Sequence, residues 1–126
     1  MGAAEMDEEL AATVEDSHGT NGSVIMKVDL VKNKVFLDGY YKGLSLDGVK
    51  GKVPAGQPRL ILYYYQCKYV CPCLLFVEPP GYDLRERMSY TACIEPLAEA
   101  VGSQKTFMFE KVEDITEEQF AKAFAE

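Results

Sequence analysis

The pattern of apolar positions between Asp83 and Val101 predicts one long helix with two apolar faces. One stripe recurs at steps of four, three and four residues, the spacing of a single helix face: Tyr90, Ile94, Leu97 and Val101. Leu84 and Met88 lie one turn apart and nearly opposite that stripe, with Arg85 and Arg87 beside them. Two interpretations stay open from spacing alone. The second face is either buried between other elements or exposed as a docking surface for a partner.

The start and the middle of this helix carry further signals. Asp83 is expected to cap the helix, with Glu86 three residues later as its capping-box partner. Pro96 falls inside the helix and leaves the carbonyl of Ala92 without its usual hydrogen bond, which predicts a kink near Ala92.

Two stretches in the middle of the chain are apolar or aromatic at nearly every position, which predicts strands buried on both faces. They span residues 59–66 and 69–77, and the Cys67-Lys68 dipeptide between them permits only a tight connection. Strands that are covered on both sides need helices above and below the sheet. The fold class is therefore predicted as α+β, with three layers (α/β/α) and a mixed central sheet.

Shorter patterns complete one domain. They predict a helix that has Met6, Leu10 and Val14 on one face and ends in residues 17–22. They also predict strands at 22–28 and 34–38 with Asn33 in the turn, a weak helix at 45–52 and a strand at 105–110. A last helix is predicted to begin at Thr116 and to pack Phe120 and Phe124 inward. We expect residues 1–20 to form an acidic N-terminal segment with a short helix, and residues 21–126 to form a single domain.

Charge and length narrow the function. The chain has 126 residues and a net charge of −7, so it suits one domain and lacks the overall basic charge of a nucleic-acid-binding protein. No apolar run approaches the ~18 residues that span a membrane, and the acidic start does not resemble a signal peptide. We expect a monomeric cytoplasmic protein that binds neither nucleic acid nor membranes.

The residues that carry chemistry are few. The four cysteines are Cys67, Cys71, Cys73 and Cys93, and their spacing lacks a Cys-x-x-Cys pair. They are either a zinc site or small thiols that pack a strand, and we favour the second interpretation. His18 is the one histidine and falls among helix breakers, so no catalytic triad can be assigned. We expect a binding module without a metal or cofactor, not an enzyme.

The segment from Arg85 to Ala92 resembles the basic-Met-x-Tyr-Ala signature on the long helix of the actin-depolymerising factor (ADF) homology domain. The match is closer to one branch of that family, the glia maturation factors. Residues 21–29 are similar to the first strand of that branch, residues 57–59 to the start of its central strand, and residues 113–118 to the start of its last helix. The resemblance covers residues 21–124 and implies the ADF homology (gelsolin-like) fold, a mixed sheet between helices.

The resemblance also implies a function and two surfaces. Actin-depolymerising factors bind actin and sever filaments. Glia maturation factors bind the branch-nucleating actin-related protein complex, dissociate branches and inhibit new nucleation. In both, the first half of the long helix enters the cleft at the barbed end of an actin fold. By resemblance, the partner-binding residues are Leu84, Arg85, Arg87, Met88, Ser89, Ala92, Cys93 and Ile94. A second, weaker surface that contacts an actin subunit would comprise Gln66, Cys67, Lys68, Tyr69, Glu113 and Asp114.

Three departures from the family pattern bear on these expectations. Ile94 stands where the family usually has a lysine, acidic Glu15-Asp16 replaces the basic end of the first helix, and the hairpin at residues 66–69 is shorter than in glia maturation factors. We expect a glia-maturation-factor-like regulator that debranches actin and inhibits nucleation. The alternatives are a cofilin-like protein that depolymerises, severs or sequesters actin, and a cysteine-based metal or redox protein.

Overall fold

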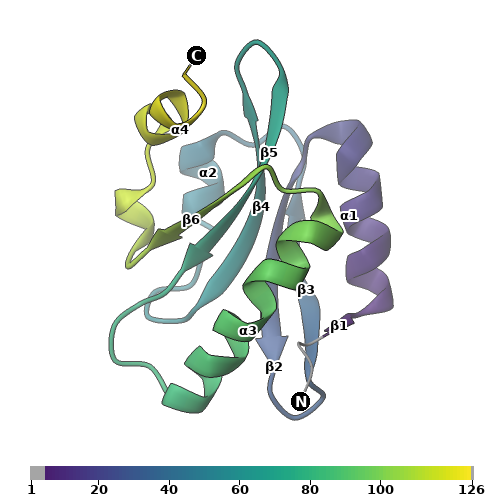
Figure 1. Cartoon of the computed structure of the whole chain (residues 1–126), viewed down its shortest axis with the longest axis vertical. Coiled ribbons are helices and arrows are strands. Elements are labelled where there is room, and N and C mark those ends of the chain that lie inside the picture. Colours follow the sequence, from purple (N-terminus) through teal and green to yellow (C-terminus); the bar gives the residue numbers. More distant parts are fainter. Residues whose placement is uncertain (1–4, 126) are drawn as a thin grey trace.

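The computed structural model describes residues 5–125 as one mixed sheet between two layers of helices (Figure 1). The six described strands lie in the order β1-β3-β2-β4-β5-β6. Their bounds are Glu5–Met6 for β1, Ser23–Asp29 for β2, Lys34–Tyr41 for β3, Arg59–Gln66 for β4, Val70–Val77 for β5 and Lys105–Phe109 for β6. The helices are α1 (Glu8–Thr20), α2 (Leu46–Lys50), α3 (Leu84–Val101) and α4 (Glu117–Ala123), with a short 3-10 helix η1 at Val112–Asp114. The predicted α+β fold with three layers is confirmed.

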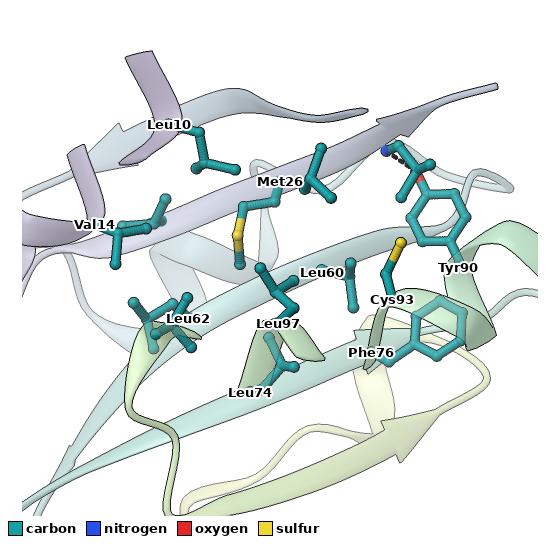
Figure 2. Packing of buried hydrophobic residues seen from close by; sticks show 14 of the residues in the cluster. Leu10, Val14, Met26, Leu60, Leu62, Leu74, Phe76, Tyr90, Cys93 and Leu97 are labelled. Carbon is teal, nitrogen blue, oxygen red and sulfur yellow. Dashed lines mark hydrogen bonds between the residues drawn. The ribbon is translucent and has the colours of Figure 1, made fainter. Parts of the chain in front are cut away.

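Two hydrophobic cores lie on opposite faces of the sheet, as the unbroken apolar strands predicted. Neighbouring residues of β4 divide between them: Leu60 and Leu62 face one core, and Ile61 faces the other. Figure 2 shows the first core, in which Leu10 of α1 and Leu97 of α3 cover the sheet. The second core is closed by α2 and α4, through residues that include Leu46, Val49 and Phe120.

The strand directions explain why α3 lies where it does. The pairs β2–β3, β2–β4 and β4–β5 are antiparallel, whereas β5 and β6 are parallel neighbours. Parallel strands need a crossover connection, and α3 provides it. The helix therefore packs along one face of the sheet, with its start at one end of β5 (Figure 1).

The first helix ends within residues 17–22, as predicted. It runs through Ser17 and ends at Thr20, where Asn21 adopts the left-handed conformation with φ 59° and caps it. Ser17 does not break the helix because its hydroxyl is bonded inside the core, 2.6 Å from the Tyr64 hydroxyl. His18 is likewise held in the helix, with Nε2 3.2 Å from the carbonyl oxygen of Val101.

The strands near the N-terminus differ from the prediction in two places. Met6 belongs to β1, which pairs with β3, and not to the first helix. The third strand continues three residues beyond the predicted end, to Tyr41, because β2 offers it backbone partners up to Ser23. Residues 1–4 of the predicted N-terminal segment and residue 126 of the predicted domain lie outside the described residues. Within residues 5–125, no helix is both long enough and apolar enough to cross a membrane.

Candidate partner-binding site on helix α3

Helix α3 begins and ends at capping residues. The Asp83 carboxylate accepts a hydrogen bond from the backbone N–H of Glu86 at 3.4 Å, which confirms Asp83 as the predicted N-cap. Gly102 follows the last turn with φ 73°, a conformation that favours glycine, and its N–H donates to the carbonyl oxygens of Ala98 and Glu99. Pro96 lies inside the continuous helix, and the predicted kink stays a prediction.

The buried stripe fixes how the helix is turned about its axis. Tyr90, Leu97 and Val101 are buried in the first core, as predicted. The Tyr90 ring stacks on Phe76 with ring centroids 5.6 Å apart. Its hydroxyl accepts from the Val28 N–H at 3.0 Å, the dashed line in Figure 2, and donates to the carbonyl of Pro58 at 3.2 Å. The helix is therefore anchored to the sheet through Tyr90, within its first half.

The opposite face of α3 is exposed, which excludes the interpretation that it is buried between other elements. Leu84 is 67% exposed and Met88 is 63% exposed, so nothing in residues 5–125 covers this face. Arg85 and Arg87 are exposed beside them. Exposed apolar side chains with a basic rim are typical of a protein-binding surface. We call Leu84, Arg85, Arg87 and Met88 the outward face of α3.

Two residues assigned to this surface by resemblance lie elsewhere. Cys93 is 1% exposed and belongs to the first core, so its side chain is not part of the outward face. Ile94 is half-buried and packs against the same core. Ser89 is half-buried and Ala92 is exposed, so both remain beside the outward face. Cys93 and Ile94 instead pack α3 against the first core.

An ion pair restrains one of the two arginines. Arg87 Nε lies 2.5 Å from Glu78 Oε1, at the end of β5, where the Glu78 N–H also donates to the carbonyl of Phe109. Among residues 5–125, Arg85 has no such ion pair. Arg87 is thus oriented towards β6, while the Arg85 guanidinium is available to pair with an approaching carboxylate.

The structure adds two residues that the sequence analysis did not assign. Met108 of β6 is 56% exposed and lines a hollow of about 270 Å³ together with Arg87 and Glu78. The alternation of Phe107, Met108 and Phe109 on a strand is the signal that could have placed Met108 outward. Tyr82, just before α3, has a buried hydroxyl with no hydrogen-bond partner in the described chain, and burial raises its pKa to about 12.

The expected second surface does not form one patch. Gln66, Cys67, Lys68 and Tyr69 are exposed at the tip of the β4–β5 hairpin, at the top of Figure 1. Glu113 and Asp114 lie in η1, which follows β6. Because β6 runs parallel to β5 and its end pairs with Val77, η1 follows the end of β5 that is remote from the hairpin tip. The hairpin residues and the two acids are therefore separate regions.

The cysteines are distributed over both faces of the sheet. Cys73 belongs to the second core and Cys93 to the first. In the described part of the chain, no group of three or more His, Cys, Asp or Glu side chains could hold a metal ion.

Comparisons with known proteins agree with this geometry. The family described as "Cofilin/tropomyosin-type actin-binding protein" matches residues 3–125. Human glia maturation factor beta is 33% identical over 104 residues, which cover 78% of this chain and 73% of the relative. The Drosophila melanogaster glia maturation factor is 26% identical over 120 residues, covering 90% and 87% of the two chains.

Solved structures share the same fold. The solution structure of glia maturation factor from Caenorhabditis elegans matches with a TM-score of 0.83 at 16% identity, covering 98% of this chain and 97% of that one. Streptomyces griseoflavus cofilin matches with a TM-score of 0.83 at 10% identity, covering 98% of both chains. The architecture is therefore the ADF homology fold.

The outward face of α3 thus belongs to a protein with the ADF homology fold. The chain belongs to the cofilin/tropomyosin-type actin-binding protein family, in its glia maturation factor branch. Membership makes it an actin-regulating protein associated with the cytoskeleton, in a family of binding regulators.

Proposed function

We propose that this protein binds the branch-nucleating actin-related protein complex, promotes the dissociation of filament branches and inhibits new nucleation. One observation carries the proposal: an apolar pair, Leu84 and Met88, is exposed on a helix that Tyr90 holds firmly to the sheet. A surface that is apolar, preorganised and rimmed by arginines loses little conformational freedom on binding.

The proposed mechanism is occupation of a cleft. Met88 is a flexible apolar side chain that fills irregular gaps, and the small Ser89 and Ala92 allow close approach of the helix. Arg85 pairs with a carboxylate at the edge of the cleft. The helix then occupies the barbed-end cleft of an actin-related subunit and loosens the contact of that subunit with the daughter filament. The protein acts as a cytoplasmic monomer without catalysis.

A cofilin-like action on actin itself is the second candidate, and similarity to S. griseoflavus cofilin in fold favours it. Two features count against it. Ile94 supplies no positive charge where the family usually has a lysine, and α1 exposes Glu15 and Asp16 where that branch is basic.

The test is a side-by-side titration of the purified complex and of actin monomers, together with a count of branches over time. Met88→Glu should weaken binding to the complex by at least about tenfold, because it places a charge in the apolar contact. Ala100→Glu is the matched control: it adds the same charge at an exposed position in the last turn of α3. Tight binding to actin alone would favour the cofilin-like alternative. Equal effects of the two substitutions would refute the proposed site.

A further inference from the structure

The tip of the β4–β5 hairpin brings two thiols together. Cys67 Sγ lies 3.8 Å from Cys71 Sγ. Both sulfurs also lie near one backbone atom, the carbonyl oxygen of Tyr69, at 3.5 Å for Cys67 and 3.7 Å for Cys71. The two side chains are therefore on the same side of the turn and directed towards each other.

The register of the hairpin accounts for this placement. The last paired residues are Gln66 and Val70, and Tyr65 is paired with Cys71. Paired residues of antiparallel strands share a face of the sheet, so Cys71 lies on the face of Tyr65. Cys67 is two residues beyond Tyr65 and returns to that face. The strand register thus places Cys71 on this face, and the bend of residues 67–69 brings Cys67 beside it.

The two thiols differ in accessibility and in acidity. Cys67 is exposed, and backbone hydrogen bonding at Tyr69 lowers its pKa below the ordinary value. Cys71 is buried, and burial raises its pKa. An exposed thiol with a lowered pKa beside a second thiol is the arrangement in which oxidation ends in a disulfide.

We propose that Cys67 and Cys71 form an oxidation site that reacts with hydrogen peroxide and closes to a reversible intramolecular disulfide. The Cys67 thiolate attacks one peroxide oxygen, the O–O bond breaks, and the departing oxygen takes up the thiol proton as water. Cys67 is then a sulfenic acid. The Cys71 sulfur attacks the Cys67 sulfur, the S–O bond breaks, and a second water leaves with the Cys71 proton. Two thiols are oxidised and one peroxide is reduced to two waters.

Closure needs only a local movement. The sulfurs must approach from 3.8 Å to about 2.05 Å, and Cys67 stands in the bend of residues 67–69, outside the strand ladder. Cys73 and Cys93 are nearly inaccessible in the two cores. The site lies at the end of the sheet remote from the start of α3 (Figure 1), so it does not depend on the proposed partner-binding function.

The experiment oxidises the full chain with hydrogen peroxide, alkylates the remaining thiols under denaturing conditions and maps tryptic peptides. Trypsin cuts after Lys68, so the disulfide would join peptides 60–68 and 69–85, and reduction with dithiothreitol would separate them. Fragmentation between Cys71 and Pro72 distinguishes Cys71 from Cys73 as the partner. We expect two of the four thiols to be lost and the link to fall on Cys71.

Two variants sharpen the result. Cys71→Ser should leave Cys67 as a sulfenic acid that a dimedone probe traps, whereas Cys67→Ser should leave the other three cysteines unoxidised, because all three are buried. Cys67 is on the surface, so its substitution should not disturb folding. The proposal is overturned if all four thiols survive peroxide, if the link joins two chains, or if it joins Cys67 to Cys73.

Discussion

Removal of one hydroxyl group, in Tyr90→Phe, should measurably destabilise the protein although the residue stays aromatic. The β2–β4 ladder pairs Val24, Ile25 and Met26 with Leu62, Ile61 and Leu60. Continued by two residues, the same register sets Val28 opposite Pro58. At that place the Tyr90 hydroxyl accepts from the Val28 N–H and donates to the Pro58 carbonyl. A side chain of α3 thus replaces a direct hydrogen bond between two strands.

The expected loss of unfolding free energy depends on the contacts that remain when phenylalanine replaces Tyr90. The ring still fills its place and stacks on Phe76, so no large cavity forms. The buried N–H of Val28 loses its partner, whereas the Pro58 carbonyl keeps the hydrogen bond that Arg59 Nη1 donates at 2.8 Å. One unsatisfied buried N–H costs about 1–3 kcal/mol of unfolding free energy. Tyr90→Ala also removes the ring and should cost about 3–5 kcal/mol.

Urea unfolding at equilibrium measures the difference. Tyr69→Phe is the matched control, because Tyr69 is exposed on the hairpin and its change should stay within about 0.5 kcal/mol. The m-value should be the same in all variants, since the surface exposed on unfolding does not change. If Tyr90→Phe and Tyr69→Phe are equally stable, Val28 and Pro58 can bond to each other without the Tyr90 hydroxyl, and the hydroxyl does not anchor α3.

Three further outcomes are expected. Leu97→Ala should lower the unfolding free energy by about 2–5 kcal/mol in the same urea assay, because it truncates a buried contact of α3. Replacing Arg85 and Arg87 together by alanine should weaken binding to the actin-related complex about tenfold, yet lower stability by only about 1 kcal/mol, since the Arg87 side chain is 60% exposed although its partner Glu78 is 17% exposed. Tyr82→Phe should raise stability by about 1 kcal/mol at neutral pH, because it removes a buried hydroxyl without a partner. Burial raises the pKa of Tyr82 from 10.0 to about 12, so the native chain should lose stability as the pH rises from 10 towards 12, and thermal unfolding should show a smaller loss in Tyr82→Phe.

Patterns within one element could be predicted from the sequence. The spacing of Tyr90, Leu97 and Val101 reports helix geometry directly, and the helix buries that stripe. This spacing does not determine the rotation of the helix about its axis precisely enough to place each residue beside the stripe. Cys93 and Ile94 are adjacent and differ by 100° around the axis, and the anchoring of Tyr90 between two strands decides that Cys93 faces the core.

Features that depend on distant partners could not be predicted. The first helix passes through Ser17 because a hydroxyl 47 residues later in the chain satisfies the serine. Glu113 and Asp114 lie apart from the hairpin tip because of the parallel register of β5 and β6. The contact of Cys67 with Cys71 requires the exact length of the turn, which sequence spacing leaves open.

The crossover from β5 through α3 to β6 has a consequence for motion and folding. The register joins Cys73 to Lys105, and the whole helix lies within the loop that this pair closes. The helix therefore cannot separate from the sheet as a loose arm, since both of its ends continue into neighbouring strands. Slow opening of α3 should be coupled to the opening of β5 and β6, so the amide protons of all three elements should exchange with solvent as one cooperative unit.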